Sequence, residues 1–355
     1  MNLVVAFLAT FALSFFLSLS LTPLMIYLGK RLKIVAKVSP RRHSEGDRRQ
    51  VSKLGGVALY SSIVVTILFA QLLDIPRFDP NEVIRLTGFL LGSTVIFVAG
   101  ILDDVFELPP LTLLAAQILA AGIAIAFMIF IEGFNNPFTG EHTAPWPFAF
   151  TVVLTLVWLV GMTNTVNWMD GVDGLATGVV CIAAMVLFVN AAFILYPAQT
   201  SVSLLPLAVV GAALGFLPFN FTPARVFLGG GAFLLGYVIG CLSIIGGAKM
   251  ATILMVMGLP ILDAAWQAAS RILQGRSPFI GDRGHLHFRL VDMGISQRQI
   301  ALGYYLFCTI FGTLTLMISS RQFKFVSLLA MAVIILLGFL IILFVPHRKA
   351  LSPKE

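Results

Sequence analysis

Long apolar runs alternate with short polar segments along the whole chain. Many of the runs reach about 18 residues, the length at which an apolar segment is read as a membrane-spanning helix. Because backbone groups in lipid must be hydrogen-bonded within their own segment, repeated runs of this length favour helices over a barrel. The pattern predicts an all-α integral membrane protein with eleven spans, near residues 3–28, 54–73, 86–102, 111–131, 148–163, 175–195, 202–219, 232–248, 250–270, 300–318 and 326–345.

The composition agrees with this interpretation. Of the 355 residues, 59% are hydrophobic and 11% are charged, whereas soluble domains carry about 25% charged residues. The first run, residues 3–28, is too long for the core of a signal peptide and is retained as a span. The three cysteines are scattered through apolar runs, which favours neither a disulfide framework nor a zinc site. The sequence therefore predicts one polytopic membrane domain covering residues 1–355.

The basic residues are distributed unevenly over the connections between the spans. Eighteen of the 23 Lys and Arg residues fall on one side of the membrane and five on the other. By the positive-inside rule the richer side is cytoplasmic, so we expect an outside amino terminus and a cytoplasmic carboxyl terminus in the cell inner (plasma) membrane. The net charge of +7 is then mainly an orientation signal, and no nucleic-acid partner is expected. The predicted cytoplasmic loops lie near residues 29–53, 103–110, 164–174, 220–231 and 271–299.

The most distinctive polar segment is the third of these loops. It places two amides and two carboxylates at intervals of three residues, namely Asn164, Asn167, Asp170 and Asp173. On a helix, neighbours three residues apart share a face, so these side chains are expected to converge. Carboxylates with supporting amides suit a hard cation such as Mg²⁺, which prefers oxygen ligands and bound phosphates. The alternative interpretation is a polar helix-capping loop between two spans.

Other carboxylates lie at the ends of spans on the same side. Asp103 and Asp104 end the third span, and adjacent carboxylates repel each other unless a cation lies between them. A general base or a metal ligand would use that arrangement, while the alternative is capping of the next helix, whose first turn favours negative charge. Asp263 lies near the inside end of the ninth span, where a lone buried carboxylate is usually paired internally.

The late loop combines histidine with arginine, in the order Arg283, His285, His287 and Arg289. On an extended strand His285 and His287 would point the same way, and the arginines would complete a clamp for a diphosphate. A basic juxtamembrane loop is the alternative, and zinc lacks further ligands at suitable spacing. Upstream, Asn220 precedes the turn Gly229-Gly230-Gly231, and a glycine-rich turn before a helix can hold phosphate through its N–H groups.

Four motifs follow one another on the predicted cytoplasmic side: Asp103-Asp104, Asn164-x-x-Asn167-x-x-Asp170-Gly-x-Asp173-Gly-Leu, Asn220-x-x-Pro223-Ala-x-x-Phe227-x-Gly229, and His285-x-His287-x-Arg289. Together they resemble the polyprenyl-phosphate N-acetylhexosamine-1-phosphate transferase family, of the glycosyltransferase family 4 type. Within it the chain is more similar to the bacterial undecaprenyl-phosphate N-acetylglucosamine-1-phosphate transferases than to the muramoyl-pentapeptide branch. The second motif is the most specific of the four.

The resemblance implies that a polyprenyl phosphate attacks the β-phosphorus of a UDP-N-acetylhexosamine. UMP leaves, and the lipid-linked sugar starts a cell-envelope glycan. The resemblance implies catalytic roles for Asp103, Asp104, His285, His287 and Arg289. It implies substrate binding by Asn164, Asn167, Asp173, Asn220 and Arg283, and Mg²⁺ (or Mn²⁺) binding by Asp104, Asp170 and Asp173. The oligomeric state is left open, a homodimer included.

The chain departs from the family pattern in three places. The family carries Gly-Asp-x-Gly after the third motif, whereas this chain has Gly229-Gly230-Gly231-Ala232 and no carboxylate. Phe288 stands where a further His is common, and Ser52 stands where Pro is typical. A catalytically weakened homologue that binds polyprenyl phosphate is therefore one alternative function. A secondary transporter is another, but no repeat relates the two halves and the polar clusters lie at span ends and not at the midplane.

Overall fold

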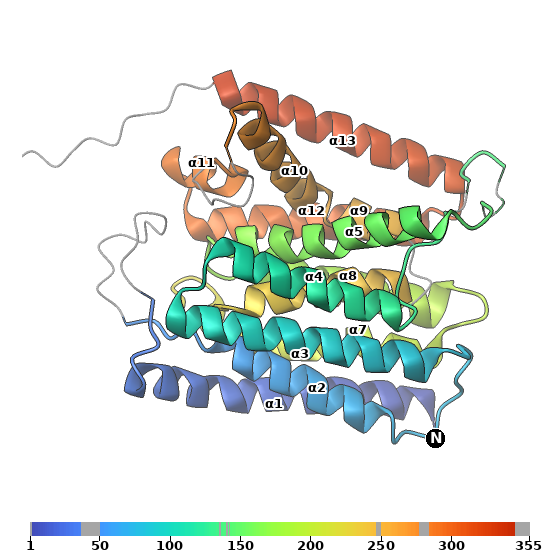
Figure 1. The fold of residues 1–355 in the computed structure, drawn as a ribbon, viewed down its shortest axis with the longest axis horizontal. Helices are drawn as coiled ribbons and strands as arrows, with labels where there is room; N and C mark the ends of the chain where they lie inside the picture. The colour runs from blue at the N-terminus through green and yellow to red at the C-terminus, as the bar shows by residue number, and fades with distance from the viewer. Residues whose placement is uncertain are drawn as a thin grey trace, which may run out of the picture.

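The computed structural model describes residues 2–36, 50–134, 136–139, 141, 143–245, 250–276 and 284–344. In these residues the chain is helical and forms no strand, so the predicted all-α architecture is confirmed. Most helices lie side by side as one bundle, with α1 at one edge and α13 at the other (Figure 1). The elements are α1 (Leu3–Arg31), α2 (Gly55–Ala70), α3 (Glu82–Phe106), α4 (Pro110–Ala126), α5 (Phe148–Met169), α6 (Leu175–Val189), the π-helical η1 (Asn190–Ile194), α7 (Thr200–Asn220), α8 (Gly231–Ile245), α9 (Met250–Val256), α10 (Gly258–Leu273), α11 (Leu286–Asp292), α12 (Gln297–Met317) and α13 (Arg321–Phe344).

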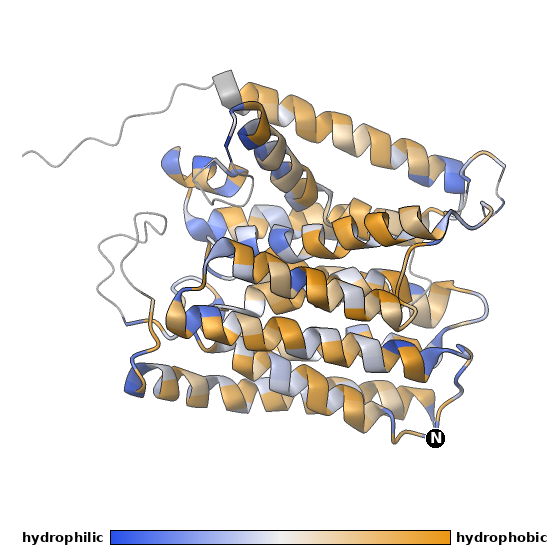
Figure 2. Ribbon diagram, viewed as in Figure 1, coloured by the Kyte–Doolittle hydropathy of each residue, from blue (hydrophilic) through white to orange (hydrophobic). Residues whose placement is uncertain are grey.

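The bundle has the polarity profile of a membrane protein. Apolar residues dominate the middle of the helices, and polar residues gather toward their two ends (Figure 2). Helices α6, α7 and α8 are buried over most of their length and form the centre. Outer helices instead expose large aliphatic side chains, such as Val333, Ile334 and Leu337 of α13. An exposed apolar belt around a packed centre is what a surrounding bilayer stabilises.

The predicted count of eleven spans is not established by the helices. In the described part of the chain, seven helices are long and apolar enough to cross a membrane, or eight if α9 and α10 form one span. The shorter apolar helices α2, α4 and α8 have 16, 17 and 15 residues. At a rise of about 1.5 Å per residue they extend for about 22–26 Å, less than the roughly 30 Å of a hydrocarbon core. Eleven crossings therefore remain a prediction.

The span predicted near residues 250–270 is not one straight helix. The chain breaks at Met257, and α9 and α10 meet at an angle of 85°. Pro260 explains part of the break, because proline fits the first turn of a new helix but disrupts the interior of a continuing one. Helix α10 consequently runs obliquely to its neighbours (Figure 1).

Glycines allow close helix contacts, because the missing side chain lets two backbones approach each other. A Cβ added at Gly211 or Gly215 of α7 would come within 2.7 Å of the α1 backbone. A Cβ at Gly236 of α8 would come within 2.5 Å of the backbone of α5. Helices α1 and α7 are therefore held face to face, as are α5 and α8.

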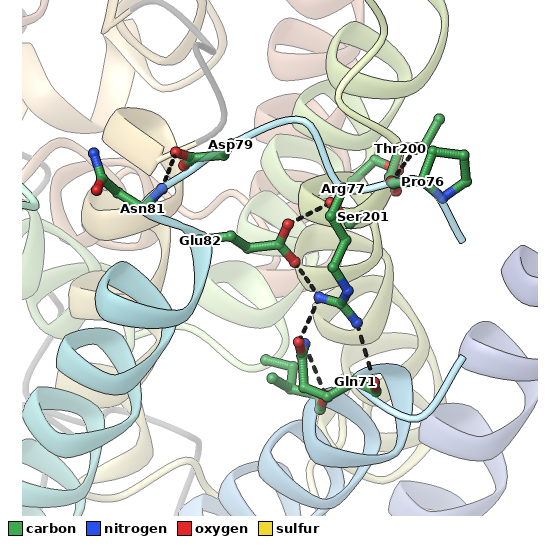
Figure 3. Close-up of polar contacts among 10 residues, drawn as sticks. Gln71, Pro76, Arg77, Asp79, Asn81, Glu82, Thr200 and Ser201 are labelled. Carbon is green, nitrogen blue, oxygen red and sulfur yellow. Dashed lines mark hydrogen bonds and ion pairs between the residues drawn. The ribbon is translucent and has the colours of Figure 1, made fainter. Parts of the chain in front are cut away.

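A buried polar network joins helices at the end of the bundle where α3 and α7 begin (Figure 3). The Glu82 side chain is 6% exposed and accepts hydrogen bonds from Arg77 and, at 2.6 Å, from the Ser201 hydroxyl. The guanidinium of Arg77 also donates to Gln71 Oε1 at 2.7 Å. These contacts tie the end of α2 to the starts of α3 and α7, on the opposite end from the site described next.

Candidate active site

Six of the eleven residues to which the sequence assigns a site role border one cavity of about 360 Å³. The cavity lies at the end of the bundle where α3 and α5 end and where α4 and α8 begin. Its polar lining residues are Lys53, Asp103, Asp104, Gln117, Asn164, Asn167, Trp168, Asp170 and His285. Apolar residues of α4 and α8, such as Leu113, Leu114 and Phe233, complete the wall. All four sequence motifs therefore contribute to one site, the third through Gly229.

The acidic pair lies in the last turn of α3 and not in a connection after it, because the helix continues to Phe106. Asp104 Oδ1 is 3.2 Å from the ammonium of Lys53, and Asp104 Oδ2 accepts the N–H of Gly230 at 2.7 Å. The Asp104 side chain is 6% exposed, so the lysine compensates a carboxylate that has little access to water. Asp103 Oδ1 accepts the N–H of Leu108 at 3.0 Å and closes the end of the helix. The pair thus combines a neutralised and a helix-capping carboxylate.

The glycine turn before α8 has a packing role. Gly229 has a φ of +57°, and a Cβ there would lie 2.3 Å from Asp104 Oδ2. A Cβ at Gly230 would lie 2.3 Å from the backbone of Gly100. The N–H of Gly230 is bonded to Asp104, and that of Gly231 to the carbonyl of Leu228. These N–H groups are used inside the protein, so the interpretation of the turn as a phosphate loop is not supported.

Two of the predicted substrate or metal residues lie elsewhere. Asp173 Oδ2 accepts the N–H of Ala224 at 3.0 Å, and Asp173 does not border the cavity. Asn220 is 1% exposed and links Thr177 to the carbonyl of Val226, at 2.7 and 3.0 Å. The interval of three brings Asn164, Asn167 and Asp170 together on the end of α5, but α5 ends at Met169 and the next turn carries Asp173 away. Asp173 and Asn220 therefore form hydrogen bonds that join segments within the protein.

Asn164 itself is held by α4. Its amide nitrogen donates to Gln117 Oε1 at 2.6 Å and to the carbonyl of Val160 at 2.9 Å. Gln117 is 5% exposed and was not predicted as a site residue. A glutamine in the middle of an apolar run was the only sequence signal for it.

The two histidines of the late loop lie at the start of a helix and not on an extended strand. His285 is the N-cap residue of α11, and His287 lies in the first turn of that helix. Their rings are nevertheless nearly parallel, with centroids 5.6 Å apart and an interplanar angle of 13°. His285 borders the cavity, whereas His287 is 1% exposed and does not border it. Arg289 Nε donates to the carbonyl of Gly284 at 2.9 Å. Arg283 lies outside the described residues.

Two basic residues were missed by the sequence interpretation. Lys53 was counted among the orientation charges, yet its ammonium reaches Asp104. Arg271 is 3% exposed, and its guanidinium lies over the ring of Trp168 at 5.5 Å. A spacing of four and eight residues from Asp263 places Gln267 and Arg271 on its helical face, a signal that was available.

The carboxylates do not form a protein cage for a metal ion. No group of three His, Cys, Asp or Glu side chains within the described ranges is close enough to hold one. The predicted set of Asp104, Asp170 and Asp173 does not fit, because Asp104 is bonded to Lys53 and Gly230 and Asp173 lies off the cavity. Mg²⁺ is often held by one or two carboxylates and the substrate phosphates. Asp170, which borders the cavity, fits that simpler arrangement.

Comparisons with known proteins agree with the sequence motifs. Residues 86–247 match the family model of glycosyl transferase family 4. The chain is 30% identical to a probable undecaprenyl-phosphate N-acetylglucosaminyl 1-phosphate transferase of Bacillus subtilis, over 87% of this chain and 84% of that protein. It is 29% identical to a decaprenyl-phosphate N-acetylglucosaminephosphotransferase of Mycobacterium leprae, over 80% and 77% of the two chains. It is 30% identical to a phospho-N-acetylmuramoyl-pentapeptide-transferase of Staphylococcus aureus, over 76% and 87%.

Proposed function

Because this chain belongs to the polyprenyl-phosphate N-acetylhexosamine-1-phosphate transferase family, we propose that it transfers a sugar-1-phosphate from UDP-N-acetylhexosamine to polyprenyl phosphate. N-acetylglucosamine-1-phosphate and undecaprenyl phosphate are the proposed substrates, since the relative from Bacillus subtilis is named for both. The observation that carries the proposal is the cavity at one end of the bundle, where Asp103, Asp170 and His285 meet from different elements. The product would start a lipid-linked cell-envelope glycan.

In the proposed reaction the polyprenyl phosphate replaces UMP on the β-phosphorus, so one phosphoanhydride bond is exchanged for another. An oxygen of the polyprenyl phosphate attacks the β-phosphorus of the nucleotide sugar. The bond between the β-phosphorus and the oxygen that bridges it to the α-phosphorus breaks, and UMP leaves with that oxygen. Phosphoryl transfer depends mainly on positioning and on compensation of negative charge. Lys53 supplies a cation at the acidic pair, and Asn164 and Asn167 supply amides that can orient the nucleotide sugar.

A divalent cation fits this proposal if one carboxylate and the substrate's diphosphate hold it. Mg²⁺ or Mn²⁺ held by Asp170 and the diphosphate would polarise the phosphoryl oxygens. The chain's own residues then divide the remaining work. In this proposal Asp103 and Asp104 would act on the lipid phosphate, and His285 would act on the nucleotide sugar. Apolar residues of α4, including Leu113 and Leu114, keep one wall of the cavity dry.

We also propose that this chain crosses the plasma membrane eleven times. The cavity then opens to the cytoplasm. The cavity lies at the end of the bundle that carries Lys30, Arg31 and Lys53, in keeping with the positive-inside rule. A lipid phosphate at the bilayer surface and a water-soluble nucleotide sugar can meet only at such an interface.

A second candidate is a homologue with weakened catalysis that binds the lipid phosphate. The observation in its favour is the turn Gly229–Gly231, which lacks the family's carboxylate and packs directly against Asp104 and Gly100. Each charged ligand that is absent weakens Mg²⁺ binding.

The experiment that separates the two uses the purified protein with radiolabelled UDP-N-acetylglucosamine, undecaprenyl phosphate and Mg²⁺. The transferase proposal expects equal amounts of lipid-linked product and UMP, both dependent on the lipid and both lost in Asp170→Asn. Binding of the lipid without product from any UDP-N-acetylhexosamine would favour the weakened homologue. Absence of both binding and product would refute both candidates.

A further inference from the structure

Helix α10 presents three polar side chains to the protein interior at a spacing of four residues. Asp263, Gln267 and Arg271 are 6%, 5% and 3% exposed. Buried polar groups of this kind cost free energy unless they are hydrogen-bonded. Asp263 and Arg271 contact the ring of His285, whereas Gln267 donates to the carbonyl of Gly284 before it.

Asp263 holds His285 from one side. Its Oδ2 is 3.0 Å from His285 Nδ1, and its Oδ1 accepts the N–H of Leu286 at 2.9 Å. An ionised carboxylate can only accept hydrogen bonds. With Asp263 ionised, the Nδ1 atom carries a proton and donates a hydrogen bond to Asp263 Oδ2.

Arg271 holds the same ring from the other side. Its Nη2 lies 3.4 Å from His285 Nε2, and a guanidinium has donors but no acceptor. The Nε2 atom must therefore accept, which requires a lone pair there. Trp168 fixes both groups, because its ring lies 5.5 Å from the Arg271 guanidinium and 5.4 Å from the imidazole.

We infer that Asp263 and Arg271 are positioning residues that hold His285 neutral, with its proton on Nδ1 and its lone pair on Nε2. The histidine then contributes an acceptor to the cavity wall, and the buried positive charge beside it belongs to Arg271. This differs from a clamp in which positively charged histidines bind the diphosphate. The consequence for turnover rests on the proposed function, whereas the state of the ring does not.

The ring state is measurable without any substitution. Gly284-His285 is the only Gly-His pair in the sequence, so carbonyl ¹³C in glycine combined with ¹⁵N in histidine identifies His285 in the full chain. Correlation within that residue then assigns its two ring nitrogens. The inference expects a protonated Nδ1 and an unprotonated Nε2. A protonated Nε2, in a neutral or a charged ring, would overturn it.

Two matched variants test the positioning role. In Asp263→Asn one acceptor oxygen is exchanged for a donor, so only one of the two N–H groups keeps its partner. We expect protonated Nε2 to appear at His285 and kcat to fall about 10-fold or more with KM nearly unchanged, the scale found when the acidic partner of a functional histidine is removed. Gln267→Met is the control. Gln267 lies on the same helix as Asp263, but it donates to the carbonyl of Gly284 at 2.6 Å and not to the ring of His285.

The control is expected to keep the ring state and most of kcat. If Gln267→Met lowers kcat as much as Asp263→Asn, or if Asp263→Asn leaves the ring nitrogens unchanged, the positioning role is refuted. An unaltered protein without transferase activity would count against the proposed function alone, since the nitrogen spectra would still decide the inference.

Discussion

Replacing Gly230 with alanine is expected to damage the site from outside its lining. The added Cβ would lie 2.3 Å from the Cα and carbonyl carbon of Gly100, whereas ordinary contacts begin near 3.4 Å. The start of α8 and the end of α3 must therefore separate by about 1 Å, because packed backbone has no free space to absorb the methyl group. Overpacking of this kind costs about 1–3 kcal/mol.

The same displacement acts on the acidic pair. The 2.7 Å hydrogen bond from the Gly230 N–H to Asp104 would lengthen by about 1 Å, beyond hydrogen-bond range. Asp104 would then depend on Lys53 alone. We expect kcat to fall about 10-fold or more, equivalent to at least about 1.4 kcal/mol in the activation free energy.

Thermal unfolding in detergent and the transfer assay measure the two effects. Gly161→Ala is the matched control, because a Cβ at Gly161 of α5 meets nothing within 4 Å. The control is expected to keep both its unfolding temperature and its activity. A Gly230→Ala protein that matches Gly161→Ala in both measurements would refute the packing role given to the turn.

Three further predictions concern the acidic residues, the orientation and the far end of the bundle. Asp104→Asn and Asp170→Asn should each lower kcat about 100-fold or more, the scale of one lost electrostatic or metal contact. EDTA should abolish turnover by the unaltered protein, and added Mg²⁺ should restore it. Near-normal turnover by a folded Asp170→Asn protein would contradict the assignment. A single cysteine at position 170 should resist a membrane-impermeant thiol reagent added outside intact cells, and efficient labelling would reverse the orientation. Glu82→Ala should lower the unfolding temperature, because it leaves the Arg77 charge without its carboxylate partner, while kcat per folded molecule changes little; an equal loss of kcat would mean that the network acts on the site.

The sequence predicted the helices well and their ends poorly. Apolar runs report where lipid surrounds a helix, but α3 continues past its run and ends only where Glu107 takes a positive φ of 54°. Asp103 and Asp104 were therefore assigned to a loop although they lie in a helix. The break at Met257 was missed for a related reason, since hydropathy does not respond to the backbone effect of Pro260.

The site could be predicted as a set of residues but not as a set of contacts. The three-residue spacing correctly brought Asn164, Asn167 and Asp170 to one cavity. The partners of Asp104, by contrast, are separated from it by 51 and 126 positions, and nothing in a single sequence indicates such pairs. Asp173 does not border the cavity, because the spacing rule holds only while the helix lasts and α5 ends four residues earlier.

The most direct test of the central claim is the fate of the β-phosphorus. The unaltered protein is supplied with undecaprenyl phosphate, Mg²⁺ and UDP-N-acetylglucosamine labelled with ³²P at the β-position, and the lipid extract and the released nucleotide are separated. Phosphoryl transfer predicts that the label moves into a lipid-linked diphosphate while unlabelled UMP is released in equal amount. Label that stays in the aqueous phase as UDP, with sugar alone on the lipid, or no lipid-linked product with any UDP-N-acetylhexosamine, would contradict the account.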